Sequence, residues 1–248
     1  MKNPKLDQDW LQTPLGTYLL DREQAYFDAT VADIFGFYAV QLGMEGVDFL
    51  RNSRIPERLC CGHNAPAKLF AEPMFLPFAT QSVDLLILPH VLEYSDHPHQ
   101  VLREAERVLR PEGRLLISGF NPRSLWGLVH GLKGAEAGFP WNGHLLNAAR
   151  VKDWLALLGF ELSSGRMCCY RPPINREGWL RRFRFMELAG DKWWNLGGGV
   201  YFLQAIKRVH GMRLITPTWK AGVVRAAPSL AASKVLNFAK YKSQRDRQ

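Results

Sequence analysis

Residues 76–122 read LPFATQSVDLLILPHVLEYSDHPHQVLREAERVLRPEGRLLISGFNP, and this stretch decides the fold. It contains two short apolar runs, at 83–88 and 114–118, which predict two strands. Between the runs, apolar residues recur at helical spacing and charged residues fill the other positions. The apolar residues are Val101, Leu102, Ala105, Val108 and Leu109.

The ends of this predicted helix carry start and stop signals. Asp96 is placed to cap it, Pro98 suits its first turn, and Pro111-Glu112-Gly113 ends it. A strand, a helix and a second strand of these lengths form a right-handed parallel crossover. The stretch therefore predicts an α/β fold with a parallel sheet.

The phrases LPF, SVDLL, HVLEY, DHP and LREAERVLRPEGRLLISGFNP follow one another in fixed order within these 47 residues. They closely resemble the second half of the class I S-adenosylmethionine-dependent methyltransferase fold. The resemblance implies a doubly wound, mostly parallel, seven-stranded Rossmann-like sheet with an antiparallel edge hairpin. It also implies S-adenosyl-L-methionine as the cofactor and an acceptor that the sequence does not identify.

Shorter patterns predict the remaining elements. Residues 14–33 are amphipathic and predict a helix before the first strand, and residues 147–158 predict a helix with one apolar face. A short helix is expected at 47–52 and a glycine-rich loop at 127–143. The other predicted strands are residues 37–42, 58–61, 68–70, 160–170 and 199–207.

The chain divides into a predicted methyltransferase domain, residues 1–210, and a basic tail, residues 211–248, that is expected to be disordered. An insertion at 171–198 is too long for a hairpin turn. It carries arginines and tryptophans close together: Trp179, Arg181, Arg182, Arg184, Trp193 and Trp194.

The net charge of +9 is unevenly distributed. Residues 171–248 hold 16 Lys/Arg against 4 Asp/Glu, whereas residues 1–170 hold 16 against 19. Such an asymmetry indicates an anionic partner, which is RNA, DNA or an acidic membrane surface. The alternative is a solvated tail that only keeps the protein soluble.

In an open parallel sheet the cofactor lies across the carboxyl ends of the strands. The family implies a glycine-rich loop after strand one, because glycine lets backbone approach the cofactor closely. The matching segment is Gln41-Leu42-Gly43-Met44-Glu45-Gly46. It keeps Gly43 and Gly46 but lacks the usual acidic residue and the closely spaced glycines. The first motif is therefore degenerate, and Gly43 is its expected cofactor contact.

Further cofactor contacts are implied where strands two and three end. The family carries an acidic residue after strand two that bonds the ribose hydroxyls, and this chain has His63 there, after Cys61-Gly62. Glu72 occupies the position implied for an adenine contact, and Pro73 and Met74 follow it, with Met74 as an adenine cover. In each case a plain surface-loop residue is the alternative.

His90 ends strand four within HVLEY, where the resemblance implies an approach to the methionine part of the cofactor. A histidine bonded by local backbone is the alternative. His90 and Tyr94 are candidate catalytic residues, because some nucleophiles need a base, but no base is assigned. The acceptor mouth is expected to be lined by Phe120, Asn121, Pro122 and Trp126.

Composition narrows the class of protein. With 248 residues, 47% of them hydrophobic, the chain is long enough for one full α/β core. No apolar run reaches the roughly 20 residues that span a bilayer, and residues 1–14 lack the features of a secretory signal, so a cytoplasmic protein is expected. Cys60-Cys61 and Cys168-Cys169 are adjacent pairs. Neighbouring strand residues point to opposite faces, so we expect buried thiols and no metal site.

Three functions remain open from the sequence. The first is a methyltransferase that acts on a small molecule, which the resemblance favours by analogy. The second is a catalytically inactive binding protein that kept the fold after its first motif decayed. The third is an RNA-associated methyltransferase or scaffold, whose arginines and tryptophans contact phosphates and unpaired bases. The same tryptophans would equally suit a lid over the acceptor pocket.

Overall fold

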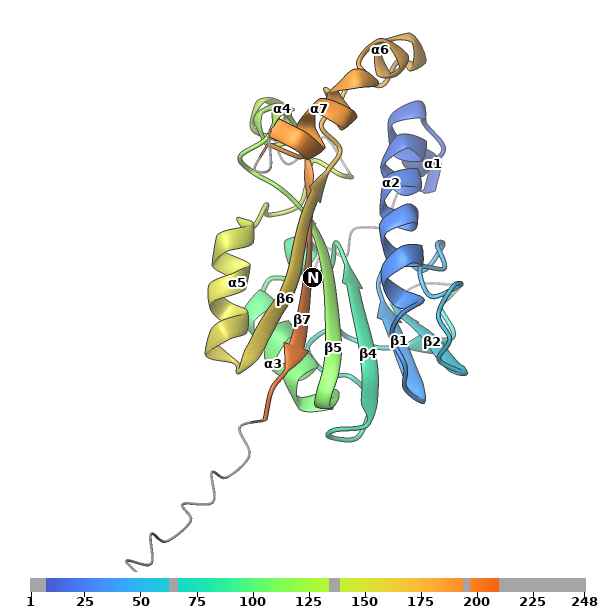
Figure 1. The fold of residues 1–248 in the computed structure, drawn as a ribbon, viewed down its shortest axis with the longest axis vertical. Helices are drawn as coiled ribbons and strands as arrows, with labels where there is room; N and C mark the ends of the chain where they lie inside the picture. The colour runs from blue at the N-terminus through green and yellow to red at the C-terminus, as the bar shows by residue number, and fades with distance from the viewer. Residues whose placement is uncertain (1–7, 63–66, 134–138, 194–196, 210–248) are drawn as a thin grey trace, which may run out of the picture. The chain divides into compact units, whose positions relative to one another are not determined.

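The computed structural model describes residues 8–62, 67–133, 139–193 and 197–209. These residues form a seven-stranded sheet in the order β3-β2-β1-β4-β5-β7-β6 (Figure 1). The strands are β1 Tyr38–Leu42, β2 Glu57–Gly62, β3 Leu69–Phe70, β4 Val83–Pro89, β5 Leu109–Phe120, β6 Phe160–Cys168 and β7 Val200–Lys207. The predicted doubly wound sheet is confirmed.

The first five strands are parallel and the last two form an antiparallel edge. β1 pairs in parallel with β2 and β4, β3 pairs with β2, and β5 pairs with β4. β7 is antiparallel to both β5 and β6. The carboxyl ends of β1, β2, β4 and β5 therefore meet at one edge of the sheet, where the sequence places the cofactor.

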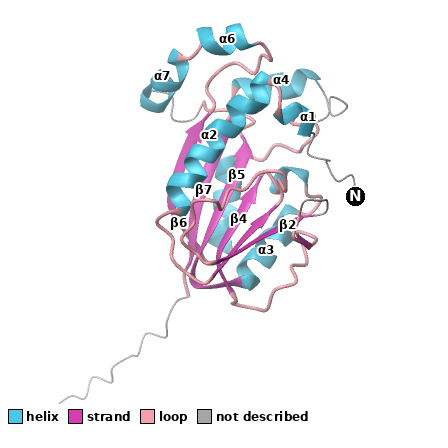
Figure 2. Cartoon of the chain, turned by 90° about the vertical axis from the view of Figure 1, so that its right-hand side faces the viewer, coloured by secondary structure: helices cyan, strands magenta, loops and turns pink. Residues whose placement is uncertain are grey.

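Helices cover both faces of this sheet (Figures 1 and 2). One buried cluster joins α2 to one face, and a second joins α3 and α5 to the other. The helices are α1 Gln8–Leu11, α2 Pro14–Val31, the 3-10 turn η1 Leu92–Tyr94, α3 Pro98–Val108, α4 Leu125–Lys133, α5 Ala148–Leu157, α6 Glu177–Arg182 and α7 Phe185–Trp193. None of the described helices combines the length and the apolar character needed to cross a bilayer.

Helix α2 forms where the sequence predicts it because its first turn is capped and one of its faces is apolar. The Thr13 hydroxyl accepts a hydrogen bond from Gly16 N at 3.1 Å, and Pro14 occupies the first turn. Toward the other end, the Tyr26 ring stacks on Phe202 of β7 with centroids 3.9 Å apart. α2 is thus fixed across the sheet.

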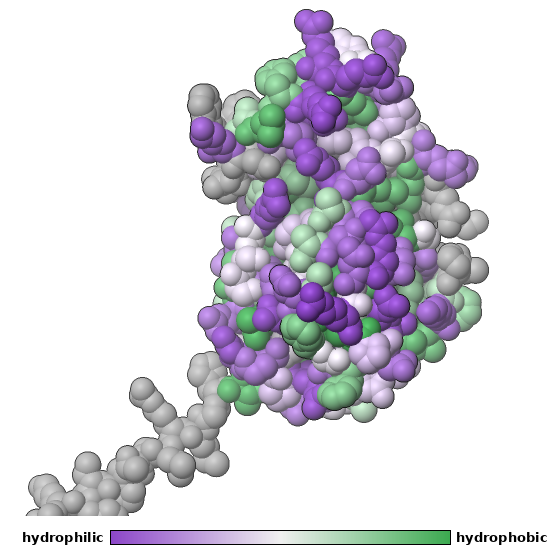
Figure 3. Space-filling model, turned by 45° about the vertical axis from the view of Figure 1, so that its right-hand side comes forward, coloured by the Kyte–Doolittle hydropathy of each residue, from purple (hydrophilic) through white to green (hydrophobic). Residues whose placement is uncertain are grey.

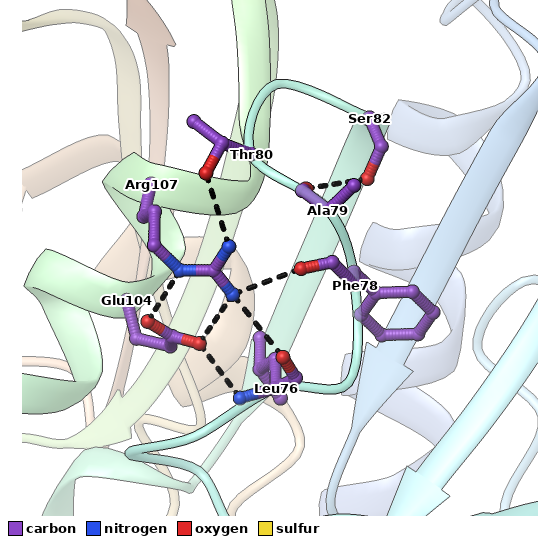
Figure 4. A network of polar contacts seen from close by, with 7 residues as sticks. All are labelled: Leu76, Phe78, Ala79, Thr80, Ser82, Glu104 and Arg107. Atoms are coloured by element: carbon purple, nitrogen blue, oxygen red, sulfur yellow. Dashed lines mark hydrogen bonds and ion pairs between the residues drawn. The ribbon is translucent and has the colours of Figure 1, made fainter.

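The phrase LPF and the helix α3 are held together by a polar network (Figure 4). Arg107 donates to the carbonyls of Leu76 at 3.1 Å and Phe78 at 2.9 Å, and also to the Thr80 hydroxyl at 3.2 Å. Glu104 accepts from Leu76 N at 2.7 Å and from Arg107 at 2.7 Å. Hydrogen bonds involving ionised groups are the stronger ones. The LPF…E-x-x-R part of the family phrase is therefore explained by the structure it stabilises.

The short helix predicted at 47–52 is wrong, because turns occupy this segment. Gln41 Nε2 donates to the Val47 carbonyl at 2.7 Å, and its Oε1 accepts from Phe49 N at 3.0 Å. Asp48 accepts from Leu50 N at 2.9 Å. Side chains thus take the backbone groups that a helix would have paired.

Two element boundaries also differ from the prediction. His97, and not Asp96, is the N-cap residue of α3, and its side chain makes no capping bond. The helix ends at Val108, because Leu109 is already extended and pairs with Val83. Pro111-Glu112-Gly113 consequently lies inside β5, with Glu112 at φ +64°.

The predicted glycine-rich loop at 127–143 contains the end of a helix, α4. Ser124 Oγ accepts from Gly127 N at 3.1 Å, which caps the first turn, and Trp126 is buried. The insertion at 171–198 contains α6 and α7. The tail, residues 211–248, lies outside the described residues, as does Trp194.

The expectation for the cysteines holds for burial but fails for geometry at one pair. Cys61, Cys168 and Cys169 are buried and Cys60 is half-buried. Cys169 has φ +62°, so the alternation of a strand ends there. The Cys168 and Cys169 sulfurs therefore lie on one side of the sheet, 3.4 Å apart.

Candidate functional site

The loop after β1 passes very close to the exit of β4. Gly43 has φ +84°, and its N–H donates to the Cys61 carbonyl at 2.9 Å. A Cβ placed on Gly43 would lie 3.0 Å from Val91 Cγ2 and 3.5 Å from the Pro89 carbonyl oxygen. Glycine is required here for both its positive φ and its lack of a side chain. The structure thus brings two predicted sites, Gly43 and His90, to one edge.

Gln41 holds this loop in place of the missing acidic residue. Besides its bonds to Val47 and Phe49, its amide donates to the carbonyls of Gly43 at 3.1 Å and Met44 at 3.2 Å. The side chain is 1% exposed. A neutral amide therefore organises the loop and brings no charge to the site.

Glu45 lies at the end of β2, although it belongs to the loop after β1. A Cβ placed on Gly62 would overlap the Glu45 carboxylate. Glu45 therefore occupies the space that a side chain at the end of β2 would fill. The resemblance implies a ribose carboxylate at this end of β2, and sequence reasoning missed Glu45 because the residue comes from a different strand. The parallel pairing of β1 and β2 was the available signal, since neighbouring parallel strands end side by side.

A pocket of about 420 Å³ adjoins Glu45 and runs alongside β2. Its lining includes Glu45, Gly46, Cys60 and Lys68. Burial, assisted by the nearby Glu45 and Asp48 carboxylates, raises the pKa of Cys60 to about 11. The thiol is consequently protonated at neutral pH and is a poor nucleophile.

His90 is enclosed at the exit of β4. It has φ +54°, its N–H donates to the Ser118 carbonyl at 3.1 Å, and its side chain is 1% exposed. Nε2 lies 2.6 Å from Oε1 of Glu23 on α2, and Nδ1 lies 3.1 Å from Oε1 of Glu93. The same Glu93 oxygen accepts from Phe120 N. The imidazole of His90 therefore contacts two carboxylates. The alternative considered from the sequence, an imidazole bonded by local backbone, does not hold, because only the backbone N–H of His90 bonds to backbone.

This cluster carries an excess of negative charge. Burial alone would lower the pKa of His90, but the Glu23 and Glu93 carboxylates outweigh it and raise the pKa to about 10. At neutral pH one imidazolium thus lies between two carboxylates. Oε2 of Glu23 and Oε2 of Glu93 are buried and have no hydrogen-bond partner among the described residues. Buried carboxylate oxygens of this kind suit a cationic ligand.

Neither candidate catalytic residue is placed to act as a base near neutral pH. His90 already holds its proton. Burial and the Glu93 carboxylate raise the pKa of Tyr94 well above its ordinary value. Tyr94 also donates to the Pro140 carbonyl at 3.3 Å, and its ring stacks on Phe139 with centroids 5.8 Å apart. Tyr94 therefore has a packing role here.

The other predicted cofactor contacts are spread along the same edge. Glu72 is exposed in a tight turn after β3, closed by the Phe75 N–H bond to the Glu72 carbonyl at 3.0 Å. Pro73 and Met74 are half-buried, and Met74 packs against the cluster under α3. β3 lies next to β2 and two strands from β1, and β4 lies on the other side of β1. His63 lies outside the described residues.

The residues expected to line the acceptor mouth are mostly buried, and their place in that mouth stays a prediction. Phe120, Asn121 and Trp126 are at most 3% exposed, and Pro122 is half-buried. Trp126 Nε1 donates to the Arg171 carbonyl at 3.0 Å, and Asn121 Nδ2 donates to the Gly198 carbonyl at 3.0 Å. These side chains attach the segments around α4, α6 and α7 to the end of β5.

Residues 46–117 match the family model described as a methyltransferase domain. The strand order and the antiparallel edge are those of the same fold. The chain has the fold of the class I S-adenosylmethionine-dependent methyltransferases, and its match to the methyltransferase-domain model covers under a third of its length.

Solved class I methyltransferases have the same fold at low sequence identity. A methyltransferase from Thermotoga maritima is 15% identical, with a TM-score of 0.56, and the likeness covers 77% of this chain and 93% of that one. Geranyl diphosphate C-methyltransferase from Streptomyces coelicolor A3(2), solved with Mg²⁺, geranyl diphosphate and S-adenosyl-L-homocysteine, is 14% identical, with a TM-score of 0.50. That likeness covers 78% of this chain and 82% of the other. These likenesses establish the fold.

A relative with higher identity is the uncharacterized protein YafS of Escherichia coli strain K12. It is 44% identical over 97 residues, which are 39% of this chain and 40% of YafS. The match therefore spans less than half of either protein. The domain match and the shared fold support methyl transfer in general and S-adenosylmethionine as the cofactor. The acceptor is not identified by it.

Proposed function

We propose that this chain transfers a methyl group from S-adenosyl-L-methionine to a small-molecule acceptor. The observation that carries the proposal is the buried His90–Glu23–Glu93 cluster at the exit of β4. It holds two carboxylates against one imidazolium and lies at the edge where Gly43 and Glu45 also lie. A cationic cofactor would neutralise its excess charge.

The residues present fit this cofactor in three respects. Its sulfonium and ammonium groups are positive, and the cluster offers the unpaired Oε2 atoms of Glu23 and Glu93. Its ribose hydroxyls would be bonded by Glu45, which lies at the end of β2 in place of a residue of that strand. Gly43 has no side chain, so it leaves space between the end of β1 and the end of β4.

The cofactor supplies an electrophilic methyl group, and the chain has to hold donor and acceptor in line. α2 covers the exit of β4, because Glu23 is 0% exposed and bonded to His90. His90 and Tyr94 keep their protons at neutral pH, so neither would deprotonate the acceptor. We infer an acceptor that is nucleophilic without proton transfer to these two residues.

The test is to incubate the full chain with methyl-labelled S-adenosylmethionine and a cell extract separated by size. Label in low-mass products is the expected result. Label confined to RNA or protein would contradict a small-molecule acceptor. A Glu45→Gln variant should lower incorporation while the chain stays folded, and Glu57→Gln is the matched control.

A second candidate function is cofactor binding without catalysis. The observation that favours it is the loop after β1, where neutral Gln41 replaces an acidic residue and turns replace the predicted helix. If the chain only binds the cofactor, S-adenosylhomocysteine should bind and no component of the extract should become labelled. Incorporation of label above a no-enzyme control would exclude it.

Binding of RNA or an acidic membrane by residues 211–248 is a separate proposal that rests on their charge of 8 Lys/Arg against 1 Asp/Glu. Such binding would act through counterion release and would weaken steeply with salt. Removal of residues 211–248 should abolish it and leave cofactor binding unchanged. A cytoplasmic location belongs to the same group of proposals, and the free thiols suit a reducing compartment.

A further inference from the structure

A pocket of about 740 Å³ lies between α2 and α6, and its lining does not include His90, Glu23 or Glu93. Four arginines contribute to its lining: Arg22 of α2, Arg171 after β6, Arg181 of α6, and Arg184 between α6 and α7. Figure 3 shows many hydrophilic residues at the top of the molecule, where Figure 1 places α6. Three separate segments of the chain therefore bring cations to one pocket.

Arg171 is held in a fixed position within this pocket. Its guanidinium lies 4.5 Å from the centroid of the Tyr18 ring, and its side chain is 15% exposed. Arg171 Nε lies 3.9 Å from Oε1 of Glu187, which is beyond hydrogen-bonding distance. Arg171 Nε is buried and has no hydrogen-bond partner among the described residues. A buried N–H that lacks an acceptor is costly unless a ligand provides one.

The acidic residues around the pocket do not balance these arginines. Glu187 pairs with Arg22 at 3.1 Å, and it also accepts from the Tyr18 hydroxyl and from Tyr170 N. Glu177 pairs with Arg181 at 2.6 Å, with both side chains more than 70% exposed, so that pair is weak. Asp21 is the remaining acid of the lining.

Arg184 carries unmatched charge, and Arg171 shares the Glu187 carboxylate with Arg22, at 3.9 Å against 3.1 Å. Arg184 forms no ion pair within the described part of the chain. Burial lowers the pKa of Arg171, and the nearby Arg22 and Arg184 cations lower it further. Cations that repel one another in a partly buried pocket favour a multivalent anion.

We propose that this pocket binds the phosphate group of a phosphate monoester. A monoester carries about −1.5 to −2 charges at pH 7 and three strong acceptor oxygens, which match several converging guanidinium forks. A carboxylate has one charge and would leave part of the cationic excess unmatched. The ligand has two sources, a water-soluble metabolite and the headgroup of an anionic lipid. Exposed Trp179 on α6 and Phe185 on α7 would favour the lipid.

The test is a titration of the full chain with glycerol 1-phosphate at physiological salt, followed by calorimetry. Saturable binding is expected, and Arg184→Gln and Arg171→Gln should each weaken it about tenfold. Arg182→Gln is the matched control, because Arg182 is the exposed neighbour on α6 that does not line the pocket. Equal weakening by Arg182→Gln, or no saturable binding of glycerol 1-phosphate or phosphatidic acid, would overturn the proposal.

Two further arms identify the source and separate this proposal from the proposed function. Flotation with phosphatidylcholine vesicles, with and without phosphatidic acid, detects a lipid headgroup, and Arg184→Gln should then release the vesicles. The affinity of each variant for a single-stranded RNA is also measured. Equal RNA affinities for Arg184→Gln and Arg182→Gln would count against a specific phosphate site in this pocket. S-adenosylhomocysteine affinity should be the same in all variants. Failure of that cofactor to bind would remove the proposed methyl transfer while phosphate binding stood.

Discussion

Nε2 of His90 lies 2.6 Å from Oε1 of Glu23, which joins the exit of β4 to the middle of α2. Both side chains are at most 1% exposed. A buried charged pair of this kind stabilises a structure weakly in comparison with apolar packing, but loss of one partner is costly. The pair therefore joins α2 to the exit of β4 through the charge of a single imidazole.

Substitution of His90 by Gln should destabilise the fold in a pH-dependent way. The pKa of His90 is raised from 6.5 to about 10 in the folded chain. Its contribution to stability is therefore fully present below pH 6.5 and is lost as pH rises through 10. Near pH 6 the variant should lose about 3 kcal/mol of unfolding free energy, because two carboxylates are left buried without their cation.

The measurement is urea unfolding of the wild type and of His90→Gln at several values between pH 6 and pH 10. The difference in unfolding free energy should shrink toward the alkaline end. His97→Gln is the control, since His97 is exposed and outside the cluster. A difference that stays constant with pH would mean that His90 is not charged in the folded chain.

Substitution of Glu45 by Gln should weaken the binding of S-adenosylhomocysteine by tenfold or more. Hydrogen bonds to an ionised group are worth about 1.5–3 kcal/mol, and the amide keeps the shape but not the charge. Glu57→Gln is the matched control, because Glu57 lines the same pocket at the opposite end of β2. Calorimetry that gives equal affinities for the two variants would remove Glu45 from the cofactor site.

Substitution of Leu102 by Ala should destabilise the fold by about 2–5 kcal/mol, because a large-to-small change leaves a cavity in a core. Leu102 is 0% exposed, between α3 and the sheet. Arg103→Ala, at the next residue on the solvated face, should cost less than about 0.5 kcal/mol. The measurement is the denaturation midpoint of each variant. Similar midpoints for Leu102→Ala and Arg103→Ala would contradict the orientation of α3.

Substitution of Arg107 by Ala should cost about 1–2 kcal/mol, since the guanidinium is about one-third exposed and solvent weakens its bonds. The loop at 76–80 would lose its contacts with α3. Thermal unfolding measures the change, with Arg103→Ala again as the control. If S-adenosylhomocysteine affinity fell together with stability, the network would belong to the site and not only to the fold.

The fold was predictable from the sequence because its deciding patterns are local. The apolar spacing at Val101, Leu102, Ala105 and Val108, together with two apolar runs, fixes a crossover. The resemblance then implies the rest of the sheet. Boundaries failed where long-range pairing overrides local signals, as at Leu109, which joins β5 through Val83. The helix expected after Val47 failed because Gln41, six residues earlier, takes its backbone groups.

The candidate site was less predictable, because its side chains come from distant parts of the chain. His90 was predicted, but its partner Glu23 is 67 residues away on α2. Glu45 lies at the end of β2 although it belongs to the loop after β1, and the parallel pairing of these two strands was the one signal for it. The predicted cofactor contacts at Glu72, Pro73 and Met74 stay predictions.

The cofactor site is tested most directly by calorimetric titration of the full chain with S-adenosylhomocysteine, which needs no acceptor. We expect one site per chain, with affinity reduced in Glu45→Gln and unchanged in Glu57→Gln. The midpoint of thermal unfolding should rise as well. At a cofactor concentration 100 times the dissociation constant, the free energy of unfolding should increase by about 2.7 kcal/mol. Neither heat nor stabilisation at millimolar cofactor, from a folded wild-type chain, would contradict the assignment of this edge as a cofactor site.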